Sequence, residues 1–461
     1  MNFIDEQSIK KSLECSINPS PQVIRQILSK ALLLKGLDQT EAAALLQIED
    51  DLLLHELFDA AFKIKNQIYG NRLVLFAPLY VSNYCSNDCL YCAFRRSNLE
   101  LKRVALSEEQ IKKEVEAIES QGHKRILMLM GEDFSAYSFE QFLKAIEIAY
   151  SVKSKQDANQ EIRRINVEIP PLSIDQFNEL KKYKIGTYTV FQETYHEETY
   201  REMHPKGMKS DYLWRLGCMD RALKSGINDV GIGVLFGLYD YKFEVLALLM
   251  HADHLDKEFG TGPHTISIPR IEPAQNAPAA NKVPNPVSDK DFKKLVAVIR
   301  CAVPYTGMIL STREKAEMRQ ELFELGVSQI SAGSRTNIGG YSGKDEPGQF
   351  SVGDSRPAQA VINDMIQRGF IPSFCTACYR LGRTGKDFMD LAKPGLIQRF
   401  CQPNALLTLQ EYLEDFADDK TKELGKKLIE TESQKIKDGK AKELFDQRLE
   451  QIKNGSRDLY F

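Results

Sequence analysis

The sequence predicts an α/β protein built around a (βα)8 barrel of the TIM type, with a helical segment before the barrel and a mainly helical domain after it. Eight short apolar stretches lie between residues 73 and 331, and amphipathic stretches with helical spacing separate them. Continuous apolar strands of this kind are typical of a parallel sheet that helices cover on both faces. Eight strand–helix units favour a closed barrel. An open, doubly wound sheet is the alternative, because it is built from the same units.

Residues 1–70 are expected to form helices. Pro21–Leu34 has apolar residues at helical spacing and begins with proline, which is favoured in a first helical turn. Asp38–Ile48 and Leu52–Ile68 continue this pattern. We therefore expect a separate N-terminal helical segment.

Residues 71–335 are expected to form the barrel. Its eight predicted strands are Leu73–Val81, Arg125–Met130, Ile165–Ile169, Thr187–Gln192, Val230–Leu235, Thr265–Ile268, Met308–Ser311 and Gln329–Ser331. The predicted helices lie near residues 107–121, 138–153, 173–182, 211–225, 242–259, 288–302 and 314–325, and the last barrel helix near 355–369.

Residues 336–461 are expected to hold that last barrel helix and a C-terminal domain. Residues 336–357 are rich in Gly, Ser, Asp and Pro, which predicts a loop. The charged stretch Leu409–Lys453 has a helical pattern and is expected to pack or face solvent rather than bind a partner.

Composition argues against two classes of partner. The 461 residues include 61 basic and 64 acidic ones, so the chain has no excess positive charge for nucleic acid. The apolar run Leu73–Val81 is about half the length of a membrane span. The first residues carry acids and no apolar signal core. We expect a cytoplasmic protein without nucleic-acid or membrane partners.

Three cysteines follow the first predicted strand, with the spacing Cys85-xxx-Cys89-xx-Cys92. Grouped thiolates suit a soft metal centre. A structural zinc ion would need a fourth ligand at regular spacing, and neither His55 nor His123 has such a spacing. Three ligands leave one iron of a 4Fe–4S cluster open, which indicates an iron that chelates a substrate or cofactor.

A second group of three cysteines lies beyond the barrel. Cys375 and Cys378 form a Cys-xx-Cys pair, and Cys401 follows after 22 residues. A zinc site that lacks one recognised ligand is one interpretation. An auxiliary 4Fe–4S cluster with an open iron fits better.

The first cysteine motif, with Tyr91 before its last cysteine, resembles that of the radical S-adenosylmethionine (SAM) superfamily. There the open iron chelates the amino and carboxylate groups of SAM, and one electron from the cluster yields a 5′-deoxyadenosyl radical. The resemblance implies that Tyr91 contacts the adenine. It also implies that Gly131 and Glu132, in LMLMGED, bind the SAM amino group, although Met130 replaces a usual glycine.

Two further SAM contacts follow from the same resemblance. Gln192 ends the fourth predicted strand, where relatives have a polar residue near the ribose. Arg215, in DYLWRL, matches a helix arginine that pairs with the SAM carboxylate, and a guanidinium suits that task.

Residues 70–461 resemble a more specific family, the FeFe-hydrogenase maturation tyrosine lyases of the HydG family. The similar stretches are FCTACYRLGRTGKDFMDLAKPG with CQPNALLTLQEYLEDF, FQETYHEETYREMHP, DVGIGVLFGLYDYKFEVL and GPHTISIPR. The near relative 2-iminoacetate synthase, of thiamine biosynthesis, shares the barrel and the tyrosine chemistry but lacks the second cysteine group.

The HydG resemblance implies a reaction and its partners. L-Tyrosine would be cleaved at its Cα–Cβ bond to p-cresol and dehydroglycine, and dehydroglycine converted to CO and cyanide for the hydrogenase H-cluster. The second cluster would carry a dangling iron, attached through a free cysteine and ligated by His264. The partners implied are an electron donor such as a ferredoxin or flavodoxin, and other hydrogenase maturation proteins.

The sequence also predicts where His264 and the arginine for the tyrosine carboxylate lie in the barrel. His264 lies directly before the sixth predicted strand, at the end of the barrel opposite to the usual active site, which would fit two reactive centres at opposite ends of one barrel. The tyrosine carboxylate needs an arginine near the strand tops. Arg313 is the first choice, with Arg270 and Arg335 as rivals.

Two non-enzyme alternatives stay open. A two-cluster electron carrier would normally close each cluster with four cysteines, and both groups here have three. A zinc-scaffold protein is the other alternative.

Overall fold

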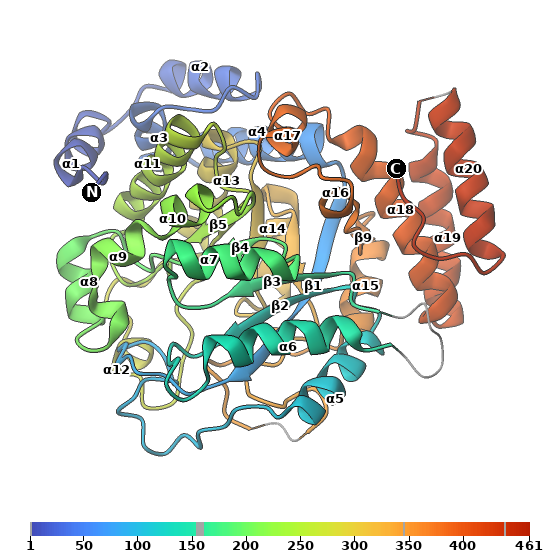
Figure 1. The fold of residues 1–461 in the computed structure, drawn as a ribbon. Coiled ribbons are helices and arrows are strands. Elements are labelled where there is room, and N and C mark those ends of the chain that lie inside the picture. Colours follow the sequence, from blue (N-terminus) through green and yellow to red (C-terminus); the bar gives the residue numbers. More distant parts are fainter. Residues whose placement is uncertain (1, 154–160, 344–345, 438) are drawn as a thin grey trace.

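The computed structural model describes residues 2–153, 161–343, 346–437 and 439–461. Its centre is a barrel of eight parallel strands (Figure 1). The strands are β1 (Arg72–Ser82), β2 (Arg125–Met130), β3 (Arg164–Glu168), β4 (Tyr188–Thr189), β5 (Val230–Gly233), β6 (Thr265–Ser267), β7 (Gly307–Leu310) and β8 (Gln329–Ser331). Because β1 pairs with both β2 and β8, the sheet is closed. The predicted barrel is confirmed, and the open-sheet alternative is wrong.

The fourth strand is much shorter than the predicted Thr187–Gln192. Only Tyr188 and Thr189 keep regular strand geometry. Beyond them the chain still follows β5, since the backbone N–H groups of Val190 and Gln192 donate to Gly231 and Gly233 at 3.2 and 3.0 Å. The chain therefore stays on the barrel wall as it approaches the loops at the strand ends.

Helices cover the outside of the barrel (Figure 1). Three of them begin alike: Ser107, Ser138 and Ser173 each accept the N–H of a glutamine three residues later, and its side chain bonds back to the serine N–H. This capping box is readable in the sequence. The helices after β1 to β4 are α5 (Glu108–Glu119), α6 (Phe139–Ser151), α7 (Ile174–Leu180), η1 (Lys181–Tyr183), α8 (Glu197–Met203), η2 (Met208–Ser210), α9 (Tyr212–Leu216) and α10 (Cys218–Lys224).

In the described part of the chain, five helices follow in the second half of the barrel. They are α11 (Tyr241–Phe259), α12 (Pro278–Asn281), α13 (Asp289–Ala302), α14 (Ala316–Leu325) and α15 (Ala358–Gln367). One predicted helix is wrong in detail: residues 211–225 form the two helices α9 and α10, which meet at Gly217. The described parts of the predicted loop, 336–343 and 346–357, contain no helix or strand.

The described residues before the barrel form α1 (Glu6–Cys15), α2 (Pro21–Ala31), α3 (Gln39–Leu46) and α4 (Asp51–Tyr69). The last three correspond to the predicted helical stretches, and α1 was not singled out in the sequence. Pro21 opens α2, and the Ser20 hydroxyl caps it by accepting the N–H of Val23. The four helices pack against α11, α13 and α14 of the barrel.

A short ninth strand, β9 (Ile371–Ser373), extends the sheet beside the start of β1. It pairs with Arg72–Val74, whereas β2 joins β1 only from Ala77 onward. The helices after it are α16 (Ala377–Arg380), α17 (Gly385–Ala392), α18 (Gln398–Asp415), α19 (Asp419–Ser433) and α20 (Lys440–Lys453). Because α18 packs on both β9 and the start of the barrel, the C-terminal helices lie beside the barrel (Figure 1). In the described parts of the chain, we find no helix that is long and apolar enough to cross a membrane.

Candidate active site and second cysteine pocket

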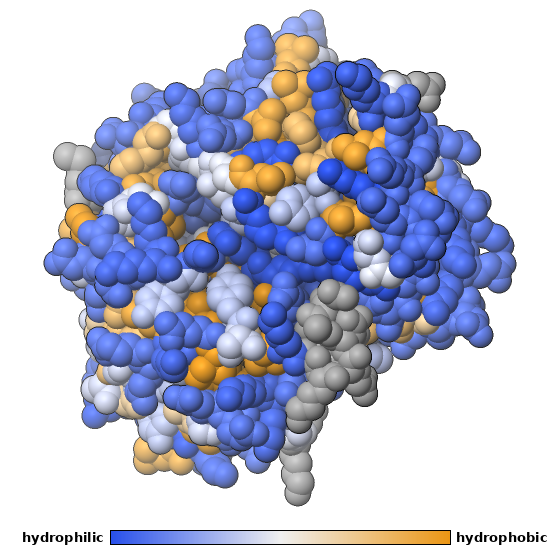
Figure 2. Space-filling view, turned by 45° about the vertical axis from the view of Figure 1, so that its right-hand side comes forward, coloured by the Kyte–Doolittle hydropathy of each residue, from blue (hydrophilic) through white to orange (hydrophobic). Residues whose placement is uncertain are grey.

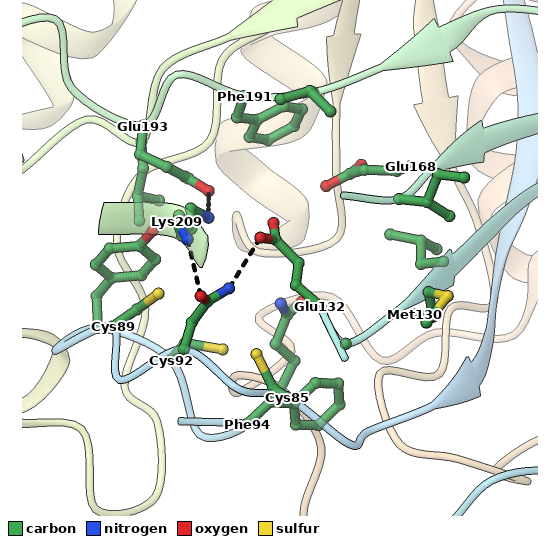
Figure 3. A pocket seen from close by; sticks show the side chains of 18 of the residues that line it. Cys85, Cys89, Cys92, Phe94, Met130, Glu132, Glu168, Phe191, Glu193 and Lys209 are labelled. Carbon is green, nitrogen blue, oxygen red and sulfur yellow. Dashed lines mark hydrogen bonds and ion pairs between the residues drawn. The ribbon is translucent and has the colours of Figure 1, made fainter. Parts of the chain in front are cut away.

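The loop after β1 brings Cys85, Cys89 and Cys92 to one cavity at the carboxyl ends of the strands. Their three side chains lie on the same side of that cavity (Figure 3). The loop is tied to the turn after β2, since the N–H and hydroxyl of Ser86 donate to the Glu132 carbonyl at 3.2 and 2.8 Å. The structure therefore brings the three predicted cluster ligands together.

These thiols are protonated in the absence of a metal. Burial raises the pKa of Cys85 and Cys89 to about 12 and that of Cys92 to about 11. Only the thiolate ligates a metal, so metal binding must displace the protons.

The arrangement suits a cluster better than a single ion. A tetrahedral zinc ion would hold its thiolates about 3.8 Å apart, given Zn–S bonds of about 2.3 Å. Among the residues that the structure describes, no three Cys, His, Asp or Glu side chains gather tightly enough to hold one ion. Three thiols that face a shared cavity without gathering at one point fit a larger group with one cysteine on each of three irons.

A carboxylate network lines the same cavity. Glu132 forms an ion pair with Arg215, with 2.9 Å between Oε1 and Nη1, and accepts a hydrogen bond of 2.8 Å from Asn87. A second ion pair joins Lys209 to Glu193 (Figure 3). Burial alone would raise the pKa of Glu132, but Arg215 and Lys209 outweigh it and hold this pKa below its usual value. The Glu132 carboxylate is therefore charged and can accept hydrogen bonds from an ammonium group.

The structure brings most of the predicted SAM contacts to this wall. Tyr91, Gly131, Glu132 and Arg215 line the cavity. The Tyr91 hydroxyl lies 2.8 Å from Nε2 of His204, which fixes its ring.

Gln192 is the exception and is not brought to the wall. Its neighbours Phe191 and Glu193 line the cavity instead. Gln192 is 3% exposed, and its Nε2 has no hydrogen-bond partner among the described residues. Successive side chains of an extended backbone point in opposite directions. Because Phe191 and Glu193 point into the cavity, the side chain of Gln192 between them points away from it.

Several lining residues were missed by the sequence reasoning. Glu193 has φ +71°, which no sequence pattern indicates, and Lys209 belongs to the short helix η2. Glu168, the last residue of β3, could have been suspected, because it is a carboxylate next to the end of the predicted strand Ile165–Ile169.

A central cavity continues into the barrel. Tyr80, Glu168 and Arg313 line both this cavity and the first one. Burial, with Glu193 adding to it, raises the pKa of Glu168 to about 7. The Arg313 guanidinium lies 3.3 Å from the ring centroid of Phe350 and makes no hydrogen bond to any described residue.

The two rival arginines, Arg270 and Arg335, bind other parts of the protein. Arg270 pairs with Glu314 and with Asp289, the latter at 2.8 Å. Arg335 donates to the carbonyl of Ser334 at 3.2 Å. Neither lines the central cavity, so Arg313 is the arginine there that is free to bind a carboxylate.

The second cysteine group lines another cavity, at the amino ends of the strands. Cys375 follows β9, Cys378 lies in α16 and Cys401 lies in α18. Together with His264 they line one pocket, which shares Gln329 with the central cavity. Three adjoining cavities therefore lead from one cysteine group to the other.

His264 is buried in this second pocket. Its ring packs against Phe388 at 4.4 Å between centroids, and its Nδ1 lies 3.5 Å from Asp229 Oδ1. Burial lowers the pKa of His264, and Asp229 opposes this only in part. The imidazole is therefore neutral near pH 7, as a metal ligand must be.

The pocket also holds two buried arginines, Arg72 and Arg125, and no carboxylate of the described residues lines it. Arg125 donates to the Cys375 carbonyl at 2.8 Å. Arg72 makes no hydrogen bond to the described residues and lies 5.0 Å from the ring centroid of Tyr69. Such a positive pocket suits an occupant with net negative charge.

A closed (βα)8 barrel with three cysteines on its first βα loop, facing a cavity with a charged carboxylate, defines a radical SAM enzyme. Residues 79–250 match the sequence model of the Radical SAM superfamily, and residues 267–371 match that of the Biotin and Thiamin Synthesis associated domain. The class implies a 4Fe–4S cluster and SAM, and the three thiols and Glu132 fit them.

Similar proteins narrow the class. The chain is 31% identical over 362 residues to 2-iminoacetate synthase of Escherichia coli (strain K12), covering 77% of this chain and 92% of the relative. It is 51% identical to a crystal structure of HydG, described as a maturase of the FeFe-hydrogenase, with all of both chains covered and a TM-score of 0.96. HydG from Carboxydothermus hydrogenoformans is 44% identical, with 97% and 98% covered and a TM-score of 0.83. The chain belongs to the HydG family of FeFe-hydrogenase maturases.

Proposed function

We propose that this protein cleaves L-tyrosine to p-cresol and dehydroglycine, and converts dehydroglycine to CO and cyanide for assembly of the hydrogenase H-cluster. One observation carries the proposal. Two cysteine-lined pockets lie at opposite ends of one barrel, and the cavity between them contains an unpaired guanidinium, Arg313.

The first pocket would hold the catalytic cluster and SAM. Cys85, Cys89 and Cys92 would ligate the cluster, Glu132 would accept hydrogen bonds from the SAM ammonium, and Arg215 would hold both Glu132 and the SAM carboxylate in place. When bound, the cluster and SAM together supply a 5′-deoxyadenosyl radical that abstracts a hydrogen atom from the tyrosine amino group.

The central cavity would hold tyrosine. The Arg313 guanidinium has no acceptor among the residues that the structure describes, so it can bind the tyrosine carboxylate through two parallel hydrogen bonds. Glu168 lines the same cavity, and its pKa of about 7 lets it take a proton from the tyrosine ammonium near neutral pH. The surrounding apolar wall, including Phe76, Leu127 and Ile309, would exclude water.

The second pocket would hold an auxiliary 4Fe–4S cluster on Cys375, Cys378 and Cys401. His264 would ligate an additional dangling iron, because its neutral imidazole is buried in the same pocket. The Arg125 bond to the Cys375 carbonyl would hold that loop in position.

The alternative function is that of 2-iminoacetate synthase. The second pocket favours the maturase function, since Cys375, Cys378 and Cys401 all lie beyond residue 371, where the matched domain shared with biotin and thiamin synthesis ends.

The electron donor would be a ferredoxin or flavodoxin, the partners other hydrogenase maturation proteins, and the compartment the cytoplasm.

The direct test is anaerobic turnover of the iron-loaded protein with SAM, dithionite and L-tyrosine. We expect both p-cresol and CO. p-Cresol without CO would indicate the synthase reaction, and the absence of both would contradict the proposal. A colourless, zinc-containing protein after anaerobic purification would support the zinc-scaffold alternative instead.

A further inference from the structure

A fourth cavity, of about 450 Å³, opens on the surface next to the second cysteine pocket. Helix η1, the segments before β4 and β5, and α16 border it, and Tyr379 lines both this cavity and the second pocket. Figure 2 turns the side of the molecule that carries α16 forward, and hydrophilic side chains cover much of this face.

The surface cavity is positively charged. Arg164, Lys181 and Lys184 line it, and none of them forms an ion pair with a carboxylate of the described residues. Arg164 donates one N–H to the Ile185 carbonyl, while its buried Nε has no acceptor. Asp229 is the acidic side chain in the lining, and it is already engaged by the Gly385 N–H at 2.9 Å.

Tyr379 separates the surface cavity from the second pocket. Its ring centroid lies 4.2 Å from the Arg164 guanidinium on the outer side and 5.5 Å from that of Arg125, which lines the inner pocket. Its hydroxyl is held by Thr187 Oγ1 at 2.9 Å. One hydrogen bond and the two flanking cations thus fix the side chain between the two spaces.

The cations form a series that leads inward. Arg164, Lys181 and Lys184 lie outside Tyr379. Arg72 and Arg125 lie inside it, in a pocket to which the described part of the chain contributes no carboxylate. A small anion moving inward therefore meets unpaired donors on both sides of the tyrosine ring. Guanidinium groups bind carboxylates through paired hydrogen bonds, which favours a carboxylate over a halide-like ion.

We propose that the surface cavity is an anion port, through which a small organic carboxylate reaches the second cysteine pocket past Tyr379. The inference rests on the proposed function in one respect: a second metal site with an open iron needs a ligand from outside the protein. A neutral molecule of the same size would gain nothing from the basic lining.

The test compares two alkylating reagents of similar size, anionic iodoacetate and neutral iodoacetamide, on the full-length chain prepared without iron. The cysteine thiolate attacks the methylene carbon of either reagent and displaces iodide, so the ratio of the two rates cancels the thiolate fraction of each cysteine. Exposed Cys15 is the internal reference. At low ionic strength we expect the iodoacetate-to-iodoacetamide ratio at Cys375, Cys378 and Cys401 to exceed that at Cys15 by about tenfold, because basic clefts raise the local anion concentration.

Variants locate the effect. Lys181→Gln with Lys184→Gln should bring the ratio close to that of Cys15, and Tyr379→Ala should speed neutral iodoacetamide at the second cysteine group. The matched control is Lys144→Gln with Lys182→Gln, two exposed lysines that pair with Glu147 and Glu179 outside the port. The control should keep the wild-type ratio, and added salt should lower that ratio without changing the iodoacetamide rate.

The outcomes decide the proposal. A ratio at the second group equal to that at Cys15, or one that the Lys181/Lys184 variant leaves unchanged, would overturn the port. Competition by acetate at constant ionic strength supports a carboxylate ligand, whereas competition by phosphate alone would overturn that choice of ligand. Tyrosine cleavage plays no part in these rates, so failure here and failure of the tyrosine lyase proposal are distinguishable.

Discussion

Glu132 and Arg215 form a buried ion pair, with 2.9 Å between Oε1 and Nη1, on the wall of the cavity that Cys85, Cys89 and Cys92 share. Because Asn87 donates to the other carboxylate oxygen at 2.8 Å, the carboxylate is fixed before any ligand binds. A preoriented charged acceptor loses little freedom when it binds an ammonium group.

Glu132→Gln should weaken SAM binding about ten- to a hundredfold. The variant keeps the shape of the side chain but removes a charge-assisted hydrogen bond worth about 1.5–3 kcal/mol. Calorimetric titration of the cluster-loaded protein with SAM measures the effect. Gln192→Ala is the control and should leave the affinity unchanged, since Gln192 lies off the cavity wall. Equal affinities for wild type and Glu132→Gln would remove Glu132 from the SAM site.

Arg313→Gln should raise the KM for tyrosine about ten- to a hundredfold while leaving SAM affinity intact. The guanidinium has no other acceptor among the described residues, so its loss removes the hydrogen bonds to the tyrosine carboxylate without breaking one inside the protein. Steady-state p-cresol formation measures the effect. Arg335→Gln, which changes an arginine outside the cavity, should behave like wild type. If Arg335→Gln raises KM and Arg313→Gln does not, our choice of arginine is wrong.

Glu168 should impose a pH dependence on tyrosine cleavage. Its pKa is about 7 because of burial, and the carboxylate form above this pH accepts the tyrosine ammonium proton. The rate of p-cresol formation should therefore rise as the pH increases through 7 and then level off. Glu168→Gln should remove this inflection and lower the rate about 10²- to 10⁴-fold. A variant that retains the wild-type pH profile would exclude Glu168 as the base.

Buried His123 should make the fold sensitive to acid. Burial lowers the pKa of His123 from 6.5 to about 4. Between these two pH values the imidazole is protonated in the unfolded chain and neutral in the folded protein. The contribution of His123 to stability is present above pH 6.5 and is lost as the pH falls toward 4, up to about 3 kcal/mol. Denaturant unfolding of wild type and His123→Gln at pH 5 and pH 7.5 measures this. The stability difference between the two pH values should shrink in His123→Gln but not in the exposed control His55→Gln.

Much of the barrel could be predicted because its strands are continuously apolar and its helices begin at Ser-x-x-Gln boxes, both of which are local signals. The strand β9 was missed because it has only three residues, one of them Pro372, and exists through its pairing with β1. Such a strand has no local pattern to recognise.

The site was predictable where chemistry dictates sequence spacing, as in the two cysteine groups, and less so where backbone direction decides. Gln192 was chosen by its position at a strand end, but the side chain that lines the cavity there is that of the next residue, Glu193. The choice among Arg313, Arg270 and Arg335 depended on which guanidinium lines the central cavity and which one already has carboxylate partners. That information comes from Glu314 and Asp289 packing around Arg270, and not from the sequence near it.

The central claim is that tyrosine cleavage and CO formation take place at opposite ends of the barrel. The most direct measurement is the yield of CO, trapped by haemoglobin, per p-cresol formed, in wild type, Cys375→Ala and His264→Ala. We expect Cys375→Ala to release p-cresol, though more slowly, with no iron-bound CO product, and His264→Ala to make much less CO per p-cresol. A wild-type CO yield from His264→Ala, or complete loss of p-cresol in Cys375→Ala, would contradict this division between the two pockets.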